Sequence, residues 1–338
     1  MKRAAAVLLV LALAGLGGCA TATGGSSRTI VVVVPADGAP VAEAVRSGLA
    51  AFAKDAPDVT TSVATATTGD ASQSSLIDEL VSNGTNAIVV FPRDAEAVAP
   101  ALARASAARV VVVTTGIPDA RRVAADLEPW DETSFGRRMM DVMAAWMGYA
   151  GQWAVLVDSG TPQVQSRRRD GEIAEAAAAY PGLVRSVDAI EAADRAAARA
   201  QVIDLLKAHP GLKAILANSP AALVGTAQAV TEAGLIGKVG VFGTSYPSEA
   251  ADHIRSGAVI AVTFSAPADL AYAALRAAHG LMLGQSVGAG ADLGRPGYDR
   301  VTVMPNAAGV PVIYGSAWMT VNRDNLKDWI RPDGSCTL

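Results

Sequence analysis

The sequence is poor in the residue types that bind metals or form disulfides. Among its 338 residues there are two cysteines and three histidines. His209, His253 and His279 lie far apart along the chain, and their spacing predicts no metal site. Cys19 and Cys336 lie near opposite ends, so no disulfide framework is expected within a domain. Stability must come from a hydrophobic core, for which a chain that is 51% hydrophobic has ample material.

The sequence also lacks signatures of several enzyme classes and of nucleic-acid binding. It contains no glycine-rich phosphate-binding loop ending in Gly-Lys-Ser or Gly-Lys-Thr, and no His-Glu-x-x-His zinc motif. An enzyme needs a nucleophile with a base or a metal cluster, so neither an enzyme nor a cofactor is predicted. Acidic residues number 32 against 28 basic ones, and this net charge of −4 argues against a nucleic-acid partner.

The first residues have the pattern of an export signal. Basic residues at positions 2–3 precede an apolar run over residues 4–16, and small residues follow it. The run is shorter than the roughly 20 residues that a membrane-spanning helix needs. We therefore predict that residues 1–18 are a signal peptide. A transcription regulator would need a DNA-binding motif in this place.

The sequence Leu-Gly-Gly-Cys at residues 16–19 resembles a bacterial lipobox. The resemblance implies that Cys19 becomes the first mature residue and carries a diacylglyceryl group on its thiol. Two or more acyl chains anchor a protein stably, which predicts attachment to the outer face of the cell membrane or a periplasm-facing location. The small residues over 19–27 are expected to form a flexible tether. An ordinary signal peptide with a free cysteine nearby is the alternative.

Strand-like and helix-like segments alternate along the rest of the chain. The β-branched run over residues 29–34 predicts a strand buried on both faces, as in a parallel sheet. Apolar residues at helical spacing over 39–54 predict an amphipathic helix. Further strands are predicted at 59–65, 87–91, 110–113, 153–157, 214–216, 239–242, 259–263, 298–303, 310–314 and 317–321. This alternation predicts an α/β fold of doubly wound sheets, and the length favours two domains.

Polar residues follow almost every predicted strand. Ligands of open parallel sheets bind beyond the carboxyl ends of the strands, so these residues are candidates for a binding site. They include Asp37, Arg93, Asp94, Thr115, Asp158, Asn218, Thr244, Tyr246 and Ser265.

Several longer segments resemble the ribose-, rhamnose- and autoinducer-2-binding proteins, which are type I periplasmic solute-binding proteins of ABC importers. The segments are 208–218, 227–234, 239–244 and 321–326, the last of which reads Val-Asn-Arg-Asp-Asn-Leu. The resemblance covers nearly the whole mature chain. It implies two Rossmann-like lobes, joined by a three-segment hinge, that close on a small polar solute and then present it to a permease. It implies no cofactor, and a monomer is the default.

The resemblance also implies domain boundaries. The N-terminal lobe is expected to comprise residues 28–128 and 264–290. The C-terminal lobe is expected to comprise 129–263 and 291–330, with a tail over 331–338.

Individual binding positions carry over from the family. Asp94 matches an aspartate that accepts hydrogen bonds from ligand hydroxyls, and Asn218 matches a polar residue of the second lobe. Gln165 and Arg167 lie where the family has polar or guanidinium contacts. These matches predict a sugar or a sugar-like ligand.

Other positions depart from the family pattern. Thr244 stands where sugar binders often have an aspartate, and Ser265 stands after Phe264 where many have an amide. The sequence from Thr115 to Asp119 replaces an Asp-x-Asp type segment. These departures argue against ribose or autoinducer-2 itself.

Most candidates also have a simpler structural interpretation. Asp94 and Asn218 could cap the helices that follow them. Trp130 could stack on a sugar ring or pack the hinge. Adjacent arginines at 167–169 point in different directions on a helix, so at most one or two of them can face a cleft.

Two alternatives to a sugar importer remain. A lipoprotein receptor that signals to a membrane kinase or a chemoreceptor would have the same two lobes. A nucleoside or another small metabolite could also occupy such a cleft. The low aromatic content of 5% favours a hydrogen-bonded polyol over a stacked nucleobase.

Overall fold

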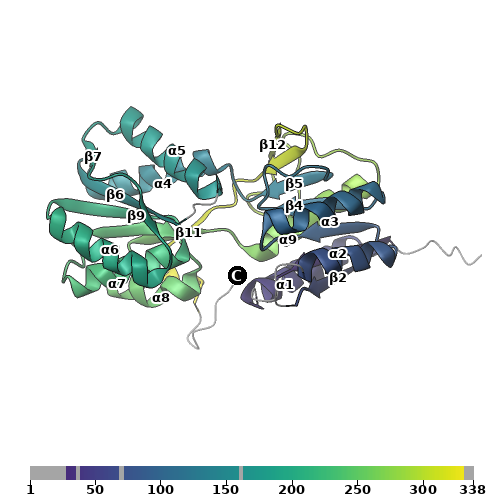
Figure 1. Ribbon diagram of the computed structural model, residues 1–338, viewed down its shortest axis with the longest axis horizontal. Coiled ribbons are helices and arrows are strands. Elements are labelled where there is room, and N and C mark those ends of the chain that lie inside the picture. Colours follow the sequence, from purple (N-terminus) through teal and green to yellow (C-terminus); the bar gives the residue numbers. More distant parts are fainter. Residues whose placement is uncertain (1–27, 36–38, 68–71, 160–162, 331–338) are drawn as a thin grey trace, which may run out of the picture.

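The computed structural model describes residues 28–35, 39–67, 72–159 and 163–330. Cys19, Asp37, the predicted signal peptide and tether, and the tail over 331–338 lie outside the described residues. Two α/β lobes lie side by side, the first on the right in Figure 1 and the second on the left. The predicted α/β class with two lobes is confirmed.

The first lobe is built on a seven-stranded sheet with the order β12-β13-β5-β4-β3-β1-β2. Its strands are parallel except β12, which pairs antiparallel with β13. Its elements are β1 (Arg28–Val34), α1 (Ala39–Asp55), β2 (Val59–Thr65), α2 (Ser72–Ser82), β3 (Ala87–Val90), α3 (Ala95–Ala107), β4 (Val111–Thr115), β5 (Ala125–Glu128), α9 (Pro267–Met282), β12 (Thr302–Pro305) and β13 (Pro311–Tyr314).

The second lobe has a sheet with the order β14-β11-β10-β9-β6-β7, and β8 also pairs with β6. Only the pairing of β14 with β11 is antiparallel. Its elements are α4 (Glu132–Met147), β6 (Gly151–Asp158), α5 (Gln163–Ala179), β7 (Leu183–Arg185), β8 (Ile190–Ala192), α6 (Arg195–Ala208), β9 (Leu212–Ala217), α7 (Pro220–Glu232), β10 (Gly240–Thr244), α8 (Pro247–Ser256), β11 (Ala261–Phe264), β14 (Met319–Asn322) and the 3-10 helix η1 (Leu326–Asp328).

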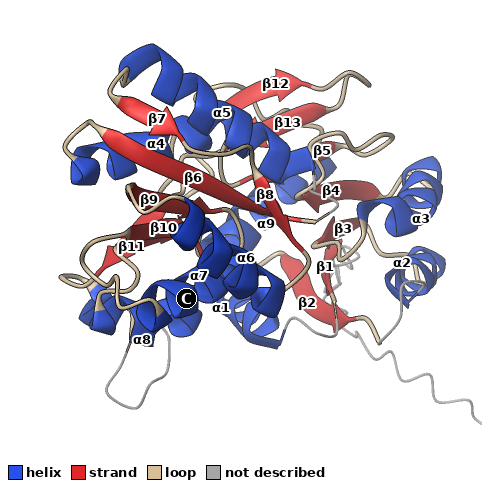
Figure 2. Ribbon diagram, turned by 60° about the vertical axis from the view of Figure 1, so that its left-hand side comes forward, coloured by secondary structure: helices blue, strands red, loops and turns tan. Residues whose placement is uncertain are grey.

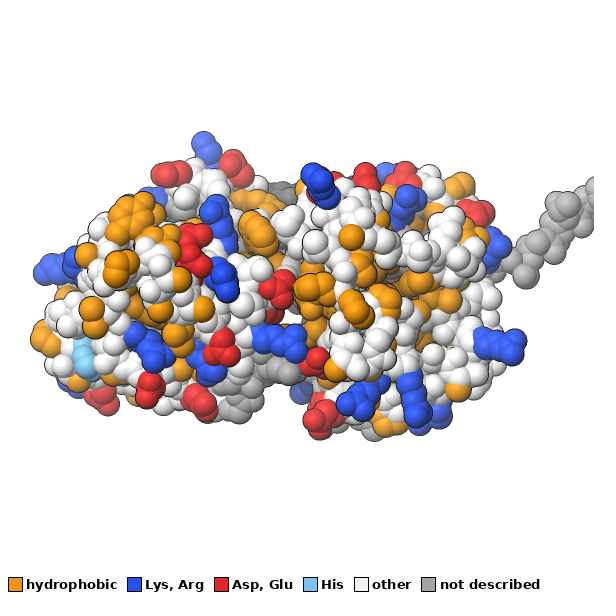
Figure 3. Space-filling model, turned by 90° about the horizontal axis from the view of Figure 1, so that it is seen from above, with side chains coloured by type: hydrophobic (Ala, Val, Ile, Leu, Met, Phe, Trp, Pro, Cys, Tyr) orange, Lys and Arg blue, Asp and Glu red, His pale blue; other side chains and the backbone are white. Residues whose placement is uncertain are grey.

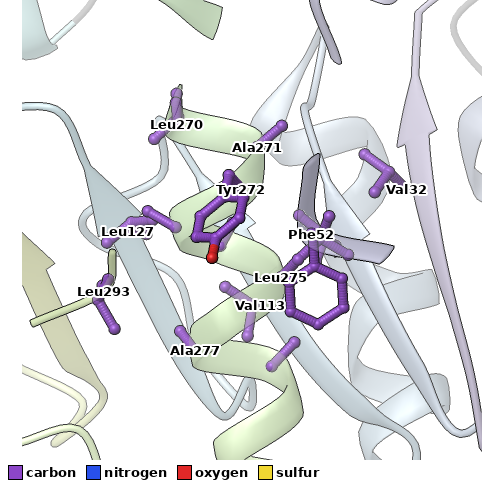
Figure 4. Packing of buried hydrophobic residues seen from close by; sticks show 14 of the residues in the cluster. Val32, Phe52, Val113, Leu127, Leu270, Ala271, Tyr272, Leu275, Ala277 and Leu293 are labelled. Carbon is purple, nitrogen blue, oxygen red and sulfur yellow. The ribbon is translucent and has the colours of Figure 1, made fainter. Parts of the chain in front are cut away.

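Helices cover both faces of each sheet (Figure 2). In β1, Val32 contributes to a core shared with α1 and α9, whereas Val33 faces α2 and α3. Figure 4 shows the first of these cores, in which Phe52 of α1 and Tyr272 of α9 meet edge to face with ring centroids 5.9 Å apart. A strand buried on both faces explains the unbroken run of valines in the sequence.

The chain passes between the lobes three times. The crossings lie between β5 and α4, between β11 and α9, and between β13 and β14. The first and third run together, because the N–H of Ala317 donates to the carbonyl oxygen of Pro129 at 3.0 Å and that of Gly315 to Glu128 at 2.9 Å. Three connections between the lobes form a hinge about which two rigid sheets can turn.

The predicted boundary of the C-terminal lobe is wrong for part of the chain. Residues 291–330 were expected there, but β12 and β13 complete the first sheet, where β13 pairs with β5. Only β14 and the residues after it join the second lobe. Short strands rich in β-branched residues look alike wherever they pair. Strand β13 pairs with β5 because β5 would otherwise leave an unpaired sheet edge. The sequence pattern of a strand does not show which strand edges remain unpaired.

Candidate functional site

A pocket of about 330 Å³ lies at the carboxyl ends of the strands of the second lobe. Strands β6, β9, β10 and β11 all end at it, as the rule for open parallel sheets requires. Seven residues singled out in the sequence line it: Trp130, Asp158, Gln165, Asn218, Thr244, Tyr246 and Ser265. The polar strand ends of this lobe therefore do converge.

Arg168 is the central charged residue of the pocket, and sequence reasoning passed over it in favour of its neighbours. Its Nε and Nη2 donate to the carboxylate of Glu132 at 2.7 and 2.9 Å. Its Nη1 donates to the carbonyl oxygen of Asn218 at 3.2 Å and to Thr244 Oγ1 at 3.0 Å. Helical spacing alone could not select one of three consecutive arginines.

Two glycines explain why this ion pair forms. A Cβ atom on Gly136 of α4 would lie 2.0 Å from the carbonyl oxygen of Arg168, and one on Gly171 of α5 would lie 2.2 Å from that of Thr133. Only glycine permits such an approach of two helix backbones. The close contact of α4 with α5 brings Glu132 beside Arg168.

Asn218 is buried at the end of β9, and a carboxylate holds its side-chain amide. Its Nδ2 donates to Glu172 Oε2 at 3.2 Å. Glu172 is fully buried, and burial raises the pKa of its carboxyl to about 7 although the nearby Arg168 lowers it. The N-cap of α7 is Ser219, whose hydroxyl accepts from the N–H of Ala222, so capping is not the role of Asn218.

Gln165 serves to hold the end of β6. Its Oε1 accepts from the N–H of Asp158 at 3.0 Å, and its Nε2 donates to Asp158 Oδ2 at 2.8 Å. Ser219 Oγ donates to the other carboxylate oxygen at 2.5 Å. These bonds fix the Asp158 carboxylate at the pocket wall.

Trp130 packs at the hinge and also borders the pocket. Its ring stacks on Phe135 with centroids 4.2 Å apart, and Arg168 lies over the Phe135 ring at 4.9 Å. The indole Nε1 is buried and has no hydrogen-bond partner in the described part of the chain. Trp130 thus has the packing role and keeps one N–H donor beside the pocket.

Arg167 lies outside the pocket. It forms a salt bridge with Asp119 of the first lobe, with Nη2 at 3.0 and 3.2 Å from the two carboxylate oxygens. It also borders a small cavity of about 10 Å³ at the hinge, together with Glu128 and Tyr314. Arg169 pairs with the neighbouring Asp170. Of the three adjacent arginines, only Arg168 therefore lines the pocket.

Among the described residues, the first-lobe candidates Arg93, Asp94 and Thr115 line no part of this pocket. Asp94 is exposed and caps α3, because its Oδ1 accepts from the N–H groups of Glu96 and Ala97 at 2.8 and 3.0 Å. The N–H of Arg93 donates to Gln73, and Thr115 Oγ1 lies 3.4 Å from the carbonyl oxygen of Val90.

A second, more apolar pocket of about 670 Å³ lies beside these first-lobe candidates. It is formed by α3 and by the loop after β4. Val164 of the second lobe is a wall residue of both pockets.

Two buried acids of β5 lie next to the hinge and were missed from the sequence. Asp126 accepts from Thr114 Oγ1 at 2.6 Å and from the N–H of Ile117 at 3.2 Å. Burial raises the pKa of Asp126. Burial, followed by the adjacent charge of Asp126, raises the pKa of Glu128 well above its usual range.

Two other kinds of site find no support. Residues 284–288 match the Gly-x-Ser-x-Gly pattern of hydrolases, but they follow α9 and lead into a loop, whereas a nucleophile elbow joins a strand to a helix. Within the described ranges, no three His, Cys, Asp or Glu residues form a group that could hold a metal ion. No helix among those residues has the length and apolar character needed to cross a membrane.

Comparison with known proteins agrees with this architecture. A family model described as periplasmic binding protein domain matches residues 30–286. The chain belongs to the periplasmic binding protein family.

Several solved structures share the fold of this chain. A sugar ABC transporter protein from Actinomyces odontolyticus has a TM-score of 0.76 at 24% identity, over 90% of this chain and 97% of that one. LsrB from Clostridium saccharobutylicum in complex with AI-2 has a TM-score of 0.69 at 22% identity, and the match covers 89% of this chain and 99% of that one. A Clostridium phytofermentas solute-binding protein with bound L-rhamnose has a TM-score of 0.70 at 21% identity, and the match covers 90% of this chain and 98% of that one.

A curated relative is the D-ribose/D-allose-binding protein of Pseudomonas aeruginosa. It is 24% identical over 229 residues, which are 65% of this chain and 70% of that protein. Within this periplasmic binding protein, the strand-end pocket of the second lobe is thus the candidate for one half of a solute site.

Proposed function

We propose that this periplasmic binding protein is the lipid-anchored solute receptor of an ABC importer and that it binds a small, uncharged, sugar-like molecule between its lobes. The observation that carries the proposal is the second-lobe pocket, where four strand ends and the first crossing converge. The sugars in the related structures and the D-ribose or D-allose in the name of the curated relative support the same ligand class.

The groups at the pocket suit hydroxyl groups, which both donate and accept hydrogen bonds. Buried atoms without a partner among the described residues include the donor Trp130 Nε1, the acceptor Asn218 Oδ1 and the hydroxyl of Ser245. Because buried polar groups are costly when unpaired, a ligand that satisfies them gains affinity. On the face seen in Figure 3, acidic and basic side chains are interspersed, and no large patch of one sign covers either lobe.

A thermal-stability screen tests the ligand class. The chain from Ser26 onward would be tested against D-allose, D-ribose, L-rhamnose, D-arabinose, autoinducer-2, nucleosides and amino acids. A ligand at a hundred times its Kd stabilises the folded state by about 2.7 kcal/mol. We expect a sugar to raise the Tm, and Asn218→Ala to abolish the rise. Asn83→Ala, which changes an exposed asparagine outside the pocket, is the matched control. A rise only with nucleosides or amino acids would overturn the sugar assignment.

The anchor and the importer role need separate tests. Cys19 would carry the lipid, so Cys19→Ser should abolish labelling with radioactive palmitate and release the protein from membranes. Uptake of the identified solute should fall when the gene is deleted and should return with the wild-type gene. Normal uptake together with a lost behavioural or transcriptional response would indicate a signalling receptor instead.

A further inference from the structure

Glu172 does not line the pocket but is hydrogen-bonded to Asn218, which does. It is fully buried on α5, and its Oε2 accepts the Asn218 Nδ2 hydrogen at 3.2 Å. Its Oε1 has no hydrogen-bond partner among the described residues. The charged groups that act on it are Arg168 and Arg169 from its own helix and Glu132 from α4. Burying a carboxyl group costs free energy unless it is hydrogen-bonded or paired, and here one of its two oxygens is not.

The contact with Glu172 decides which end of the Asn218 amide remains for a ligand. Nδ2 is engaged by Glu172, and the backbone oxygen of Asn218 accepts from Arg168 Nη1. Oδ1 is buried and unpaired within the described part of the chain, and the residue lines the pocket. The amide oxygen of Asn218 is therefore its unpaired acceptor, whereas one of the two Nδ2 hydrogens is bonded to Glu172.

Arg168 cannot supply a free positive charge for an anionic ligand. An arginine has five N–H groups. Two of those of Arg168 are bonded to Glu132, one to Thr244 Oγ1 and one to the Asn218 backbone. The Glu132 carboxylate also offsets its charge. The pocket is thus prepared for a neutral molecule with a hydrogen to donate.

We propose that Glu172 is a positioning residue that orients the side-chain amide of Asn218, so that its oxygen accepts a hydrogen bond from a ligand hydroxyl, and that this orientation responds to pH. The inference rests on the proposed function for the identity of the ligand. It rests on the Glu172–Asn218 contact alone for the orientation of the amide.

The proton on Glu172 controls the orientation. An ionised carboxylate only accepts hydrogen bonds, so it requires the Nδ2 end of the amide. A protonated carboxyl can donate its O–H to Oδ1, which allows the amide to turn by about 180° and direct Nδ2 toward the pocket. Because burial raises the pKa of Glu172 to about 7, both states are populated near neutral pH. The acceptor is therefore presented at higher pH and is lost as the pH falls below that value.

The orientation can be tested without any ligand. The side-chain amide signals of Asn218 would be followed by ¹⁵N NMR from pH 5.5 to 8.5, with Asn218→Asp to assign them. We expect a titration with a midpoint near 7 in the wild type and none in Glu172→Gln. Glu175→Gln, one turn further along α5, should keep the titration. A flat signal in the wild type, or an unchanged titration in Glu172→Gln, would overturn the positioning role.

The consequence for binding is tested with D-allose as the probe. Because the state that presents the Asn218 acceptor is about one tenth populated at pH 6 and about nine tenths at pH 8 for a pKa of about 7, we expect binding up to about tenfold weaker at pH 6 than at pH 8. Glu172→Gln should bind with the same affinity at both values, and Glu172→Leu should bind more weakly at both. Equal affinities in the wild type would overturn the pH response. Failure of the wild type to bind D-allose, with the NMR titration present, would count against the sugar and leave the positioning role standing.

Discussion

Arg167 of the second lobe and Asp119 of the first form a salt bridge across the cleft, with Nη2 and Oδ2 3.0 Å apart. Arg167 lies on α5, and Asp119 lies in the loop after β4. The bridge therefore connects the lobes outside the three crossings, and the second-lobe pocket in this conformation has no lining from the first lobe among the described residues.

Removing this bridge should have a small, salt-dependent effect. The two side chains are 33% and 48% exposed, and exposed pairs contribute about 0.2–1 kcal/mol. A double-mutant cycle of Arg167→Ala and Asp119→Ala, followed by denaturant unfolding, should give a coupling energy in that range. The coupling should shrink when salt is raised. A coupling of several kcal/mol would show that the bridge is not screened by solvent.

Breaking the buried salt bridge between Arg168 and Glu132 should destabilise the protein much more. Arg168 and Glu132 are only 8% and 13% exposed, and breaking a buried pair by removing one partner costs about 3–5 kcal/mol. Arg168→Ala should therefore lower the free energy of unfolding by about that amount and disorder the pocket. Arg199→Ala breaks the exposed pair with Glu232 and serves as the control, for which little change is expected. Similar losses for both variants would contradict the difference in burial.

The sequence predicted the fold and the general place of the site better than the individual side chains. An unbroken apolar run such as 29–34 predicts a strand that is buried on both faces, and the structure agrees. Polar residues at the ends of successive strands indicate the edge of the sheet at which a ligand binds. Arg168 was missed because Gly136 and Gly171 select it through a contact between helices distant in sequence. The placement of β12 and β13 was missed for the same reason, since a strand partner is a tertiary property.

Glu128 should make the stability of the protein depend on pH. Burial, and then the charge of Asp126, raise the pKa of Glu128 in the folded state above its value in the unfolded chain. The folded state therefore holds a proton that the unfolded state has released, and stability is lost as the pH rises. Glu128→Gln removes this loss, so it should raise the Tm more at pH 8 than at pH 5.

The exposed Glu96→Gln provides the control for this comparison, because its side chain lies on the surface of α3. Its Tm should follow that of the wild type at both pH values. If Glu128→Gln instead lowered the Tm equally at pH 5 and pH 8, the Glu128 carboxyl of the wild type would be ionised in the folded state and held by a partner.

Asp94 allows helix capping and ligand binding to be separated. Its Oδ1 caps α3, and loss of such a cap costs about 1 kcal/mol. Asp94→Ala should therefore lower the free energy of unfolding by about that amount, whereas Asp94→Ser retains a capping oxygen and should be nearly as stable as the wild type.

Both variants lack the carboxylate. If closure brings Asp94 onto a sugar hydroxyl, both should bind the sugar found in the thermal screen at least tenfold more weakly, since hydrogen bonds to charged groups contribute about 1.5–3 kcal/mol. Unchanged affinity in Asp94→Ser would restrict Asp94 to the cap and leave recognition to the second lobe.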